Sequence, residues 1–97
     1  MIEILIQPSK KADKKFDAII DGKKTVSFGA KGYSDFTMHG SEARKNAYLQ
    51  RHKARENWND PTTAGALSKF VLWNKPSIAA SVKDMDKQFK NYRIKLA

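Results

Sequence analysis

The sequence predicts an α+β domain, in which a small N-terminal antiparallel β-meander of two to four strands precedes three helices packed on one face. Three observations predict it. Residues 1–40 contain short β-branched and aromatic runs, an Asp-Gly pair separates two of these runs, and apolar residues recur at helical spacing after residue 41. A length of 97 residues fits a single domain, with a β-rich part over 1–40 and a helical part over 41–97.

The predicted strands begin with Ile2–Ile6, which is rich in β-branched residues. Phe16–Ile20 and Thr25–Phe28 flank the pair Asp21-Gly22, which favours a type I′ turn with positive φ at both central residues. The two runs therefore form a hairpin, and Tyr33–Thr37 adds a further short strand. The period of two places these side chains on one face of the hairpin: Phe16, Ala18, Ile20, Val26 and Phe28.

The predicted helices each carry a start signal. Ser41 is a good N-cap for a first helix that runs to about Trp58. Asp60-Pro61 starts a second helix, which runs to about Trp73 and is apolar on most sides, so it is expected at the centre of the fold. A third helix starts near Pro76. Its apolar stripe consists of Ile78, Val82, Met85, Phe89 and Tyr92.

Three residues in the helical part invite a packing interpretation. Gly65 lies inside the second helix, where it costs about 1 kcal/mol relative to alanine, so we expect another backbone to approach closely there. Trp58 and Trp73 each stand at a predicted helix end before an asparagine. Anchoring in the core explains both tryptophans better than stacking on nucleic-acid bases.

The composition excludes several kinds of site and favours one class of partner. There is no cysteine, which excludes disulfides, thiolate metal sites and cysteine nucleophiles, and no apolar run approaches the roughly 18–20 residues that span a bilayer. We expect a soluble intracellular protein. The net charge of +9 favours a polyanionic partner, with nucleic acid first and DNA ahead of RNA. No membrane partner is expected, because the core of so short a chain needs every apolar helix face.

The excess charge is densest in residues 41–58, which hold five basic and two acidic side chains. On a helix, Arg44, Tyr48, Arg51 and Arg55 share a stripe about 60° wide, with His52 at its border. The alanines beside this stripe predict a small-residue seam for tight packing. Together with Trp58, the seam consists of Ala43, Ala47 and Ala54.

This stripe predicts a surface that follows phosphates, because guanidinium groups bind phosphate oxygens in pairs and Tyr48 offers a ring for a base. The alternative is a solvated helix edge, with Arg51 paired to Asp35, Asp60 or Glu56 inside the fold. The lysine-rich connection after the first strand either clamps phosphate flexibly or only keeps the chain soluble. The candidate nucleic-acid-binding residues are Arg44, Tyr48, Arg51, Lys53, Arg55, Lys10, Lys11, Lys14 and Lys15.

Catalysis is not expected. Asp35, His39, His52 and Asp60 are the only set that a metal-dependent nuclease has available, and their spacing matches no metal-site signature. Simpler roles are that His39 ends a strand or caps a helix and that His52 forms a hydrogen bond at a helix edge. We therefore predict no catalytic residue, no metal and no cofactor.

Three segments carry a resemblance: Phe28–His39 (FGAKGYSDFTMH), Arg51–Trp58 (RHKARENW) and Gly65–Pro76 (GALSKFVLWNKP). Over roughly residues 16–90 the chain resembles a family of small uncharacterised proteins encoded by large DNA viruses and tailed bacteriophages. The resemblance brings no established activity. It implies a viral genome, a host cytoplasm, and roles in genome handling, virion structure or host takeover.

Together these observations predict a non-enzymatic, basic viral protein that binds nucleic acid through phosphate contacts with low sequence specificity. One alternative is a virion structural or assembly protein, in which the basic face meets the packaged genome or an acidic capsid surface. Another is a phage inhibitor of a host protein that mimics or competes for nucleic acid, and a metal-dependent nuclease ranks last. If the partner is not nucleic acid, an acidic viral or host protein surface is expected. The expected location is the host cytoplasm or the virion.

Overall fold

A four-stranded mixed sheet forms the base of the molecule, in a computed structural model that describes residues 1–97. The strands are β1 (Ile2–Pro8), β2 (Lys14–Ile20), β3 (Lys24–Ala30) and β4 (Tyr92–Leu96). Their order in the sheet is β3-β2-β1-β4, with the first three strands antiparallel and β4 parallel to β1. The N-terminal meander expected from the sequence is therefore present, and a strand from the other end of the chain extends it.

The β2–β3 hairpin has the turn that the sequence predicts. Asp21 and Gly22 have φ of 51° and 66°, as a type I′ turn requires, and the N–H of Lys23 donates to the carbonyl of Ile20 across 3.0 Å. Phe16 then pairs with Phe28, and Ala18 pairs with Val26. This register places all four side chains on the face that the helices cover.

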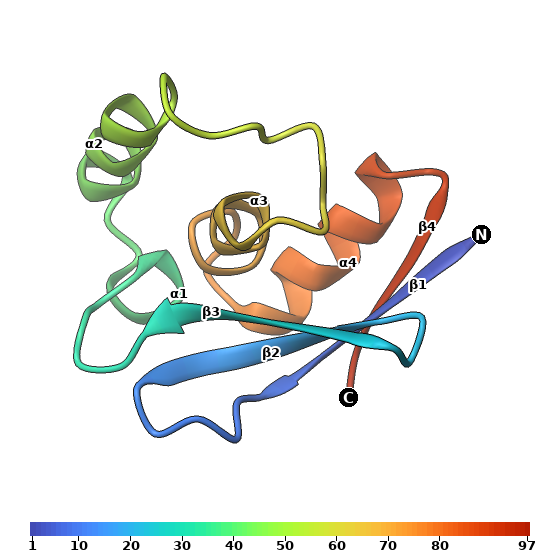
Figure 1. Cartoon of the computed structure of the whole chain (residues 1–97). Coiled ribbons are helices and arrows are strands. Elements are labelled where there is room, and N and C mark those ends of the chain that lie inside the picture. The colour runs from blue at the N-terminus through green and yellow to red at the C-terminus, as the bar shows by residue number, and fades with distance from the viewer.

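All helical segments lie on one face of the sheet, as Figure 1 shows, which confirms the predicted fold class. The π-helical turn η1 continues α3 without a break, so the two act as one central helix between α2 and α4. A π-helical turn is uncommon and is found often at functional sites. The helical segments are α1 (Phe36–His39), α2 (Glu42–His52), α3 (Ala64–Leu67), η1 (Ser68–Leu72) and α4 (Ile78–Gln88).

The hydrophobic core lies between the sheet and the central helix. Ile4, Ile6 and Phe28 rise from the sheet and meet Leu67 and Val71, all of them almost completely buried. The α4 stripe closes the core from the side, with Val82 and Met85 at its centre, and Phe89 packs against it. Trp58 and Trp73 also pack against this cluster, which confirms their predicted anchoring role.

Two predictions for residues 33–58 are wrong. Residues 36–39 form the short helix α1 and not a strand, because the Asp35 carboxylate accepts the N–H of Thr37 at 2.9 Å and caps a helical turn. The next helix, α2, ends at His52 and not near Trp58. The chain leaves α2 there and crosses to α3 (Figure 1), since Trp58 packs on the core whereas α2 buries no residue of its own.

The central helix also starts later than predicted. Asp60 and Pro61 form a turn in which the Asp60 carboxylate accepts the N–H of Thr62 at 3.0 Å, and Thr63 is the N-cap. At Gly65 the close neighbour is a side chain and not a backbone: a Cβ there would collide with the carboxylate of Glu56. The helix start moved because Thr62 and Thr63 hydroxyl groups compete for the local backbone and carboxylate partners.

The predicted alanine seam is not a packing surface. Ala43, Ala47 and Ala54 are all exposed. The helix α2 instead faces the rest of the molecule through larger side chains: the ring of Tyr48 stacks on Trp73, and the ammonium of Lys45 donates to the carbonyl of Asn74 at 2.8 Å. A ring and a long aliphatic stem bury more area than three methyl groups, so they decide how the helix is rotated.

No helix in the structure is both long enough and apolar enough to cross a membrane.

Asp17 provides a prediction about acid stability. Its carboxylate, 5% exposed, accepts hydrogen bonds from the hydroxyls of Ser9 (2.6 Å) and Ser27 (2.7 Å). These bonds hold the pKa of Asp17 below its ordinary value of 3.8. A carboxylate with a lowered folded-state pKa stabilises the fold above its unfolded-state pKa and loses that contribution as the pH falls through its folded-state pKa. The pKa values of Asp60 and Asp84 are lowered in the same way, chiefly by Thr62 and Asn74 respectively.

We expect the free energy of unfolding to fall steadily below a pH of about 4. The variant Ser9→Ala/Ser27→Ala should be less stable at neutral pH and should show a shallower acid-induced loss, because its Asp17 pKa returns toward the ordinary value. Urea denaturation between pH 7 and pH 2 measures both effects. Ser34→Ala, which removes an exposed hydroxyl, is the control. An acid dependence equal to that of the wild type would contradict this role of Asp17.

Candidate nucleic-acid interface

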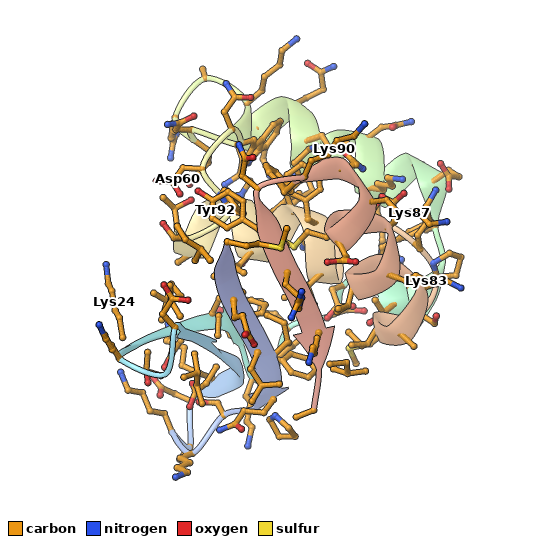
Figure 2. The ribbon with its side chains drawn as sticks, turned by 90° about the vertical axis from the view of Figure 1, so that its right-hand side faces the viewer. Lys24, Asp60, Lys83, Lys87, Lys90 and Tyr92 are labelled. Atoms are coloured by element: carbon orange, nitrogen blue, oxygen red, sulfur yellow. The ribbon has the colours of Figure 1, made fainter.

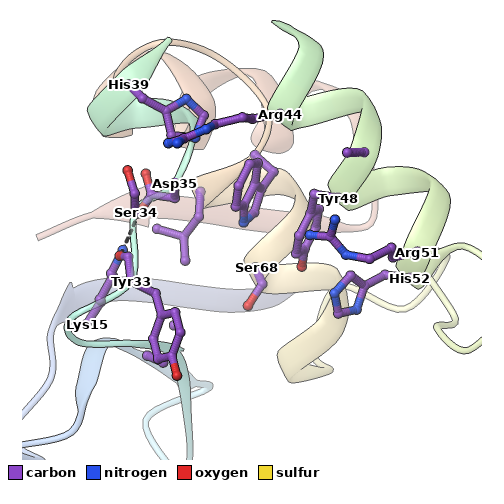
Figure 3. A pocket seen from close by; sticks show the side chains of 15 residues that line it. Lys15, Tyr33, Ser34, Asp35, His39, Arg44, Tyr48, Arg51, His52 and Ser68 are labelled. Carbon is purple, nitrogen blue, oxygen red and sulfur yellow. Dashed lines mark hydrogen bonds and ion pairs between the residues drawn. The ribbon is translucent and has the colours of Figure 1, made fainter. Parts of the chain in front are cut away.

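A cleft of about 670 Å³ opens between the β3–α1 connection, α2 and the central helix. Figure 3 shows its two long walls, with Lys15, Tyr33 and Ser34 on one side and Arg44, Tyr48 and Arg51 on the other. Ser68 from η1 lies between them. The size falls in the range of ordinary ligand sites, about 300–1,000 Å³.

The first wall is fixed by one buried ion pair. The ammonium of Lys15 lies 2.5 Å from the carboxylate of Asp35 and also donates to the carbonyl of Tyr33 at 2.6 Å. The side chain of Asp35 is 3% exposed and that of Lys15 is 15% exposed, so the pair is shielded from water. Gly29 sits beneath with φ of 78°, where a Cβ would lie 2.8 Å from a methyl group of Leu72. This wall is therefore tied to the sheet and to the central helix.

The second wall carries two arginines without acidic partners. Arg44 and Arg51 are exposed, both line the cleft, and the structure contains no salt bridge other than Lys15–Asp35. Arg51 is therefore not paired with any of the three carboxylates considered for it, and Asp35 is already occupied by Lys15. Both arginines line a concave surface, whereas Arg55, the third arginine of the predicted stripe, does not.

The ring of Tyr48 stacks on two other rings in this wall. Its ring lies parallel to Trp73, with centroids 4.3 Å apart and 5° between the planes, and His52 stacks on it with a centroid distance of 4.3 Å. Figure 3 shows Tyr48 and His52 next to each other on the same side of the cleft. Burial, together with the charge of Glu56, raises the pKa of Tyr48 to about 12. Since Trp73 and His52 occupy its faces, Tyr48 braces the wall and does not present an open ring to a base.

The remaining predicted residues lie outside the cleft. Lys53 and Arg55 are exposed in the turn that follows α2, while Lys10 and Lys11 are exposed in the β1–β2 connection. Lys14, half-buried, begins β2. The structure thus brings Arg44, Tyr48, Arg51 and Lys15 to one site. It separates these from the other candidates.

The candidate metal ligands do not assemble. Asp35, His39 and His52 line the cleft but Asp60 does not, and no three His, Asp or Glu side chains come together as a group that could hold a metal ion. His39 is the last residue of α1, and its Nδ1 accepts the N–H of Ser41 at 2.9 Å, close to the capping role predicted for it. Its Nε2 is buried without a hydrogen-bond partner.

Sequence reasoning missed three of the cleft residues that lie outside α2: Tyr33, Ser34 and Ser68. Tyr33, 73% exposed, lies on the first wall, and Ser34 and Ser68 add hydroxyl groups. The signal available for Tyr33 was an aromatic residue directly after Gly32, in a connection whose glycine indicated a bend and not a strand. No signal in the sequence pairs Trp73 with Tyr48, because 25 positions separate them.

Residues 4–52, just over half of the chain, match a family of unknown function (DUF5754). The match runs from β1 to the end of α2 and so includes both long walls of the cleft, but not η1. Comparison with curated proteins and with solved structures gives no match.

Proposed function

We propose that the chain, which belongs to this family of unknown function, binds nucleic acid in the cleft through phosphate contacts. The binding involves no catalysis and has low sequence specificity. The observation that carries the proposal is the pair Arg44 and Arg51, two unpaired guanidinium groups on one wall of one cleft. An unpaired guanidinium presents a planar set of donors that matches the oxygens of a phosphate. The net charge of +9 adds long-range attraction to a polyanion.

The spacing of the two arginines supports contact with more than one phosphate. They are seven residues apart, which corresponds to about 10.5 Å along a helix axis. A single small anion does not span that distance, whereas a phosphate chain does. The resemblance noted in the sequence supports a viral setting for this binding, in the host cytoplasm or in the virion.

The test removes the two arginines together. We expect Arg44→Ala/Arg51→Ala to weaken binding to nucleic acid by about tenfold or more, since each charge-assisted hydrogen bond contributes about 1.5–3 kcal/mol. The slope of log K against log salt should become shallower by about 0.7–0.9 for each phosphate that the variant no longer neutralises. Fluorescence anisotropy with a labelled oligonucleotide, over a series of salt concentrations, measures both quantities.

Two controls separate the cleft from diffuse attraction. Lys83→Ala/Lys90→Ala removes the same charge from the side of the molecule that carries α4, where both lysines are exposed (Figure 2). Arg55→Ala removes an arginine of the predicted stripe that does not line the cleft. Both variants should retain nearly the wild-type affinity. An equal loss in the Lys83/Lys90 variant, or an affinity that does not change with salt, would overturn the proposal.

A further inference from the structure

We propose that the cleft accepts unpaired nucleotides, so that the protein prefers single-stranded nucleic acid over a duplex. The inference rests on the proposed function and specifies its ligand. Its starting point is the shape of the site: Arg44 and Arg51 line a hollow of about 670 Å³ and do not stand on a convex surface. A hollow of this size holds a few linked groups of a ligand. The side of a double helix stays outside it.

The second argument is the aromatic side chain left free in the cleft. Tyr48 and Trp73 stack on each other, but Tyr33, on the opposite wall, is 73% exposed and takes part in no aromatic pair. Figure 3 shows the Tyr33 ring beside the opening, across from the arginines. Unpaired bases stack on exposed aromatic rings, and every base has a face that suits such stacking. In a duplex the base faces are already stacked inside the helix, so no base face is free to stack on Tyr33.

The third argument is that Tyr33 is held in position. The ammonium of Lys15 donates to the carbonyl of Tyr33, and the same ammonium is paired with buried Asp35. The backbone at Tyr33 is thus tied to the sheet while the ring remains outside. A backbone fixed in advance reduces the conformational entropy that this segment loses when a ligand binds.

The lining between the walls suits a base with a phosphate at its edge. Ala30 and Ala47 offer exposed apolar surface, whereas Ser34 and Ser68 offer hydroxyl groups that donate or accept hydrogen bonds. None of these groups reads one base exclusively. The expected ligand is therefore any unpaired stretch, with phosphates on Arg44 and Arg51 and a base on Tyr33.

The experiment compares four ligands at one salt concentration by fluorescence anisotropy or competition: single-stranded DNA and RNA of about 12 nucleotides, the matching DNA duplex, and inorganic polyphosphate. We expect each single strand to bind about tenfold or more tightly than the duplex. Tyr33→Ala should weaken binding of single strands by about 5- to 150-fold, the range for loss of one stacked base. It should leave duplex and polyphosphate binding unchanged, and Tyr33→Phe should retain the wild-type preference.

Leu96→Ala is the control, since Leu96 is 40% exposed in the edge strand β4 and does not line the cleft. Duplex binding as tight as single-strand binding would overturn the inference and leave the proposed function standing. So would an equal effect of Tyr33→Ala on all four ligands. Failure of every ligand to bind would overturn the proposed function as well.

Discussion

Replacing Lys15 by methionine is expected to lower the free energy of unfolding by about 3 kcal/mol. The substitution leaves the carboxylate of Asp35 buried without its cation, and breaking a buried ion pair from one side costs about 3–5 kcal/mol. The lower end applies because Asp35 keeps the hydrogen bonds from the N–H and the hydroxyl of Thr37. Urea denaturation monitored by tryptophan fluorescence measures the change.

A double-mutant cycle isolates the charge. Lys15→Met/Asp35→Asn removes both charges and keeps a capping oxygen at residue 35, so it should recover most of the stability that Lys15→Met removes. Lys15→Met also leaves the Tyr33 carbonyl without its ammonium donor. If Lys15→Met alone proves neutral, Asp35 does not depend on Lys15, and the first wall of the cleft is held by other interactions.

Phe28→Ala is expected to cost about 3–5 kcal/mol, the range for removing a buried aromatic ring. Phe28 is 2% exposed, lies at the centre of the core and packs on Phe16 with a centroid distance of 6.0 Å. A domain of this size has roughly 5–15 kcal/mol of total stability, so the loss is a large share of it. The melting temperature should fall by about 12 °C or more, at about 4–8 °C per kcal/mol.

Thr25→Ala on the same strand is the control for Phe28. Thr25 is exposed and makes no side-chain hydrogen bond, so its loss should cost about 0.5 kcal/mol or less. Phe28→Leu should lie between the two, because leucine fills part of the space. Equal melting temperatures for Phe28→Ala and Thr25→Ala would contradict the position of Phe28 in the core.

The parts of the fold that were predictable depend on neighbours in sequence. Asp21-Gly22 alone determines a tight turn with two positive φ angles, and the flanking runs then fix the register of β2 with β3. The stripe of Ile78, Val82 and Met85 repeats at the helical period and does face the core in α4. Such patterns lie within a few residues of chain, and the sequence displays them directly.

The strand β4 was not predicted, because its first residue continues the apolar stripe of the helix before it, α4. Tyr92 falls on the same apolar stripe as α4, and the residues after it hold one buried side chain, Ile94, between Arg93 and Lys95. What makes this segment a strand is the open edge of β1, far away in sequence. The carboxylate of Asp86 also accepts the N–H of Ile94 at 2.8 Å. The partner strand β1 lies outside any local window.

The site was predictable only in part, for the same reason. Helical periodicity correctly placed Arg44 and Arg51 on the same side of one helix, and both line the cleft. It could not show that Trp73 covers Tyr48 or that Lys15 pairs with Asp35, because those pairs join different elements. The free ring therefore belongs to Tyr33 and not to the tyrosine on the helix.

The parallel pairing of β1 with β4 has a consequence for folding during synthesis. It joins residues 2–6 to residues 92–96, so β1 keeps one bare edge until almost the whole of this sequence has emerged from the ribosome. Closing so long a loop is entropically costly before the pairing rewards it, which slows this step relative to the hairpin. During synthesis, the β1 edge of the meander stays unpaired until β4 is made, and chaperones can bind the chain in that interval.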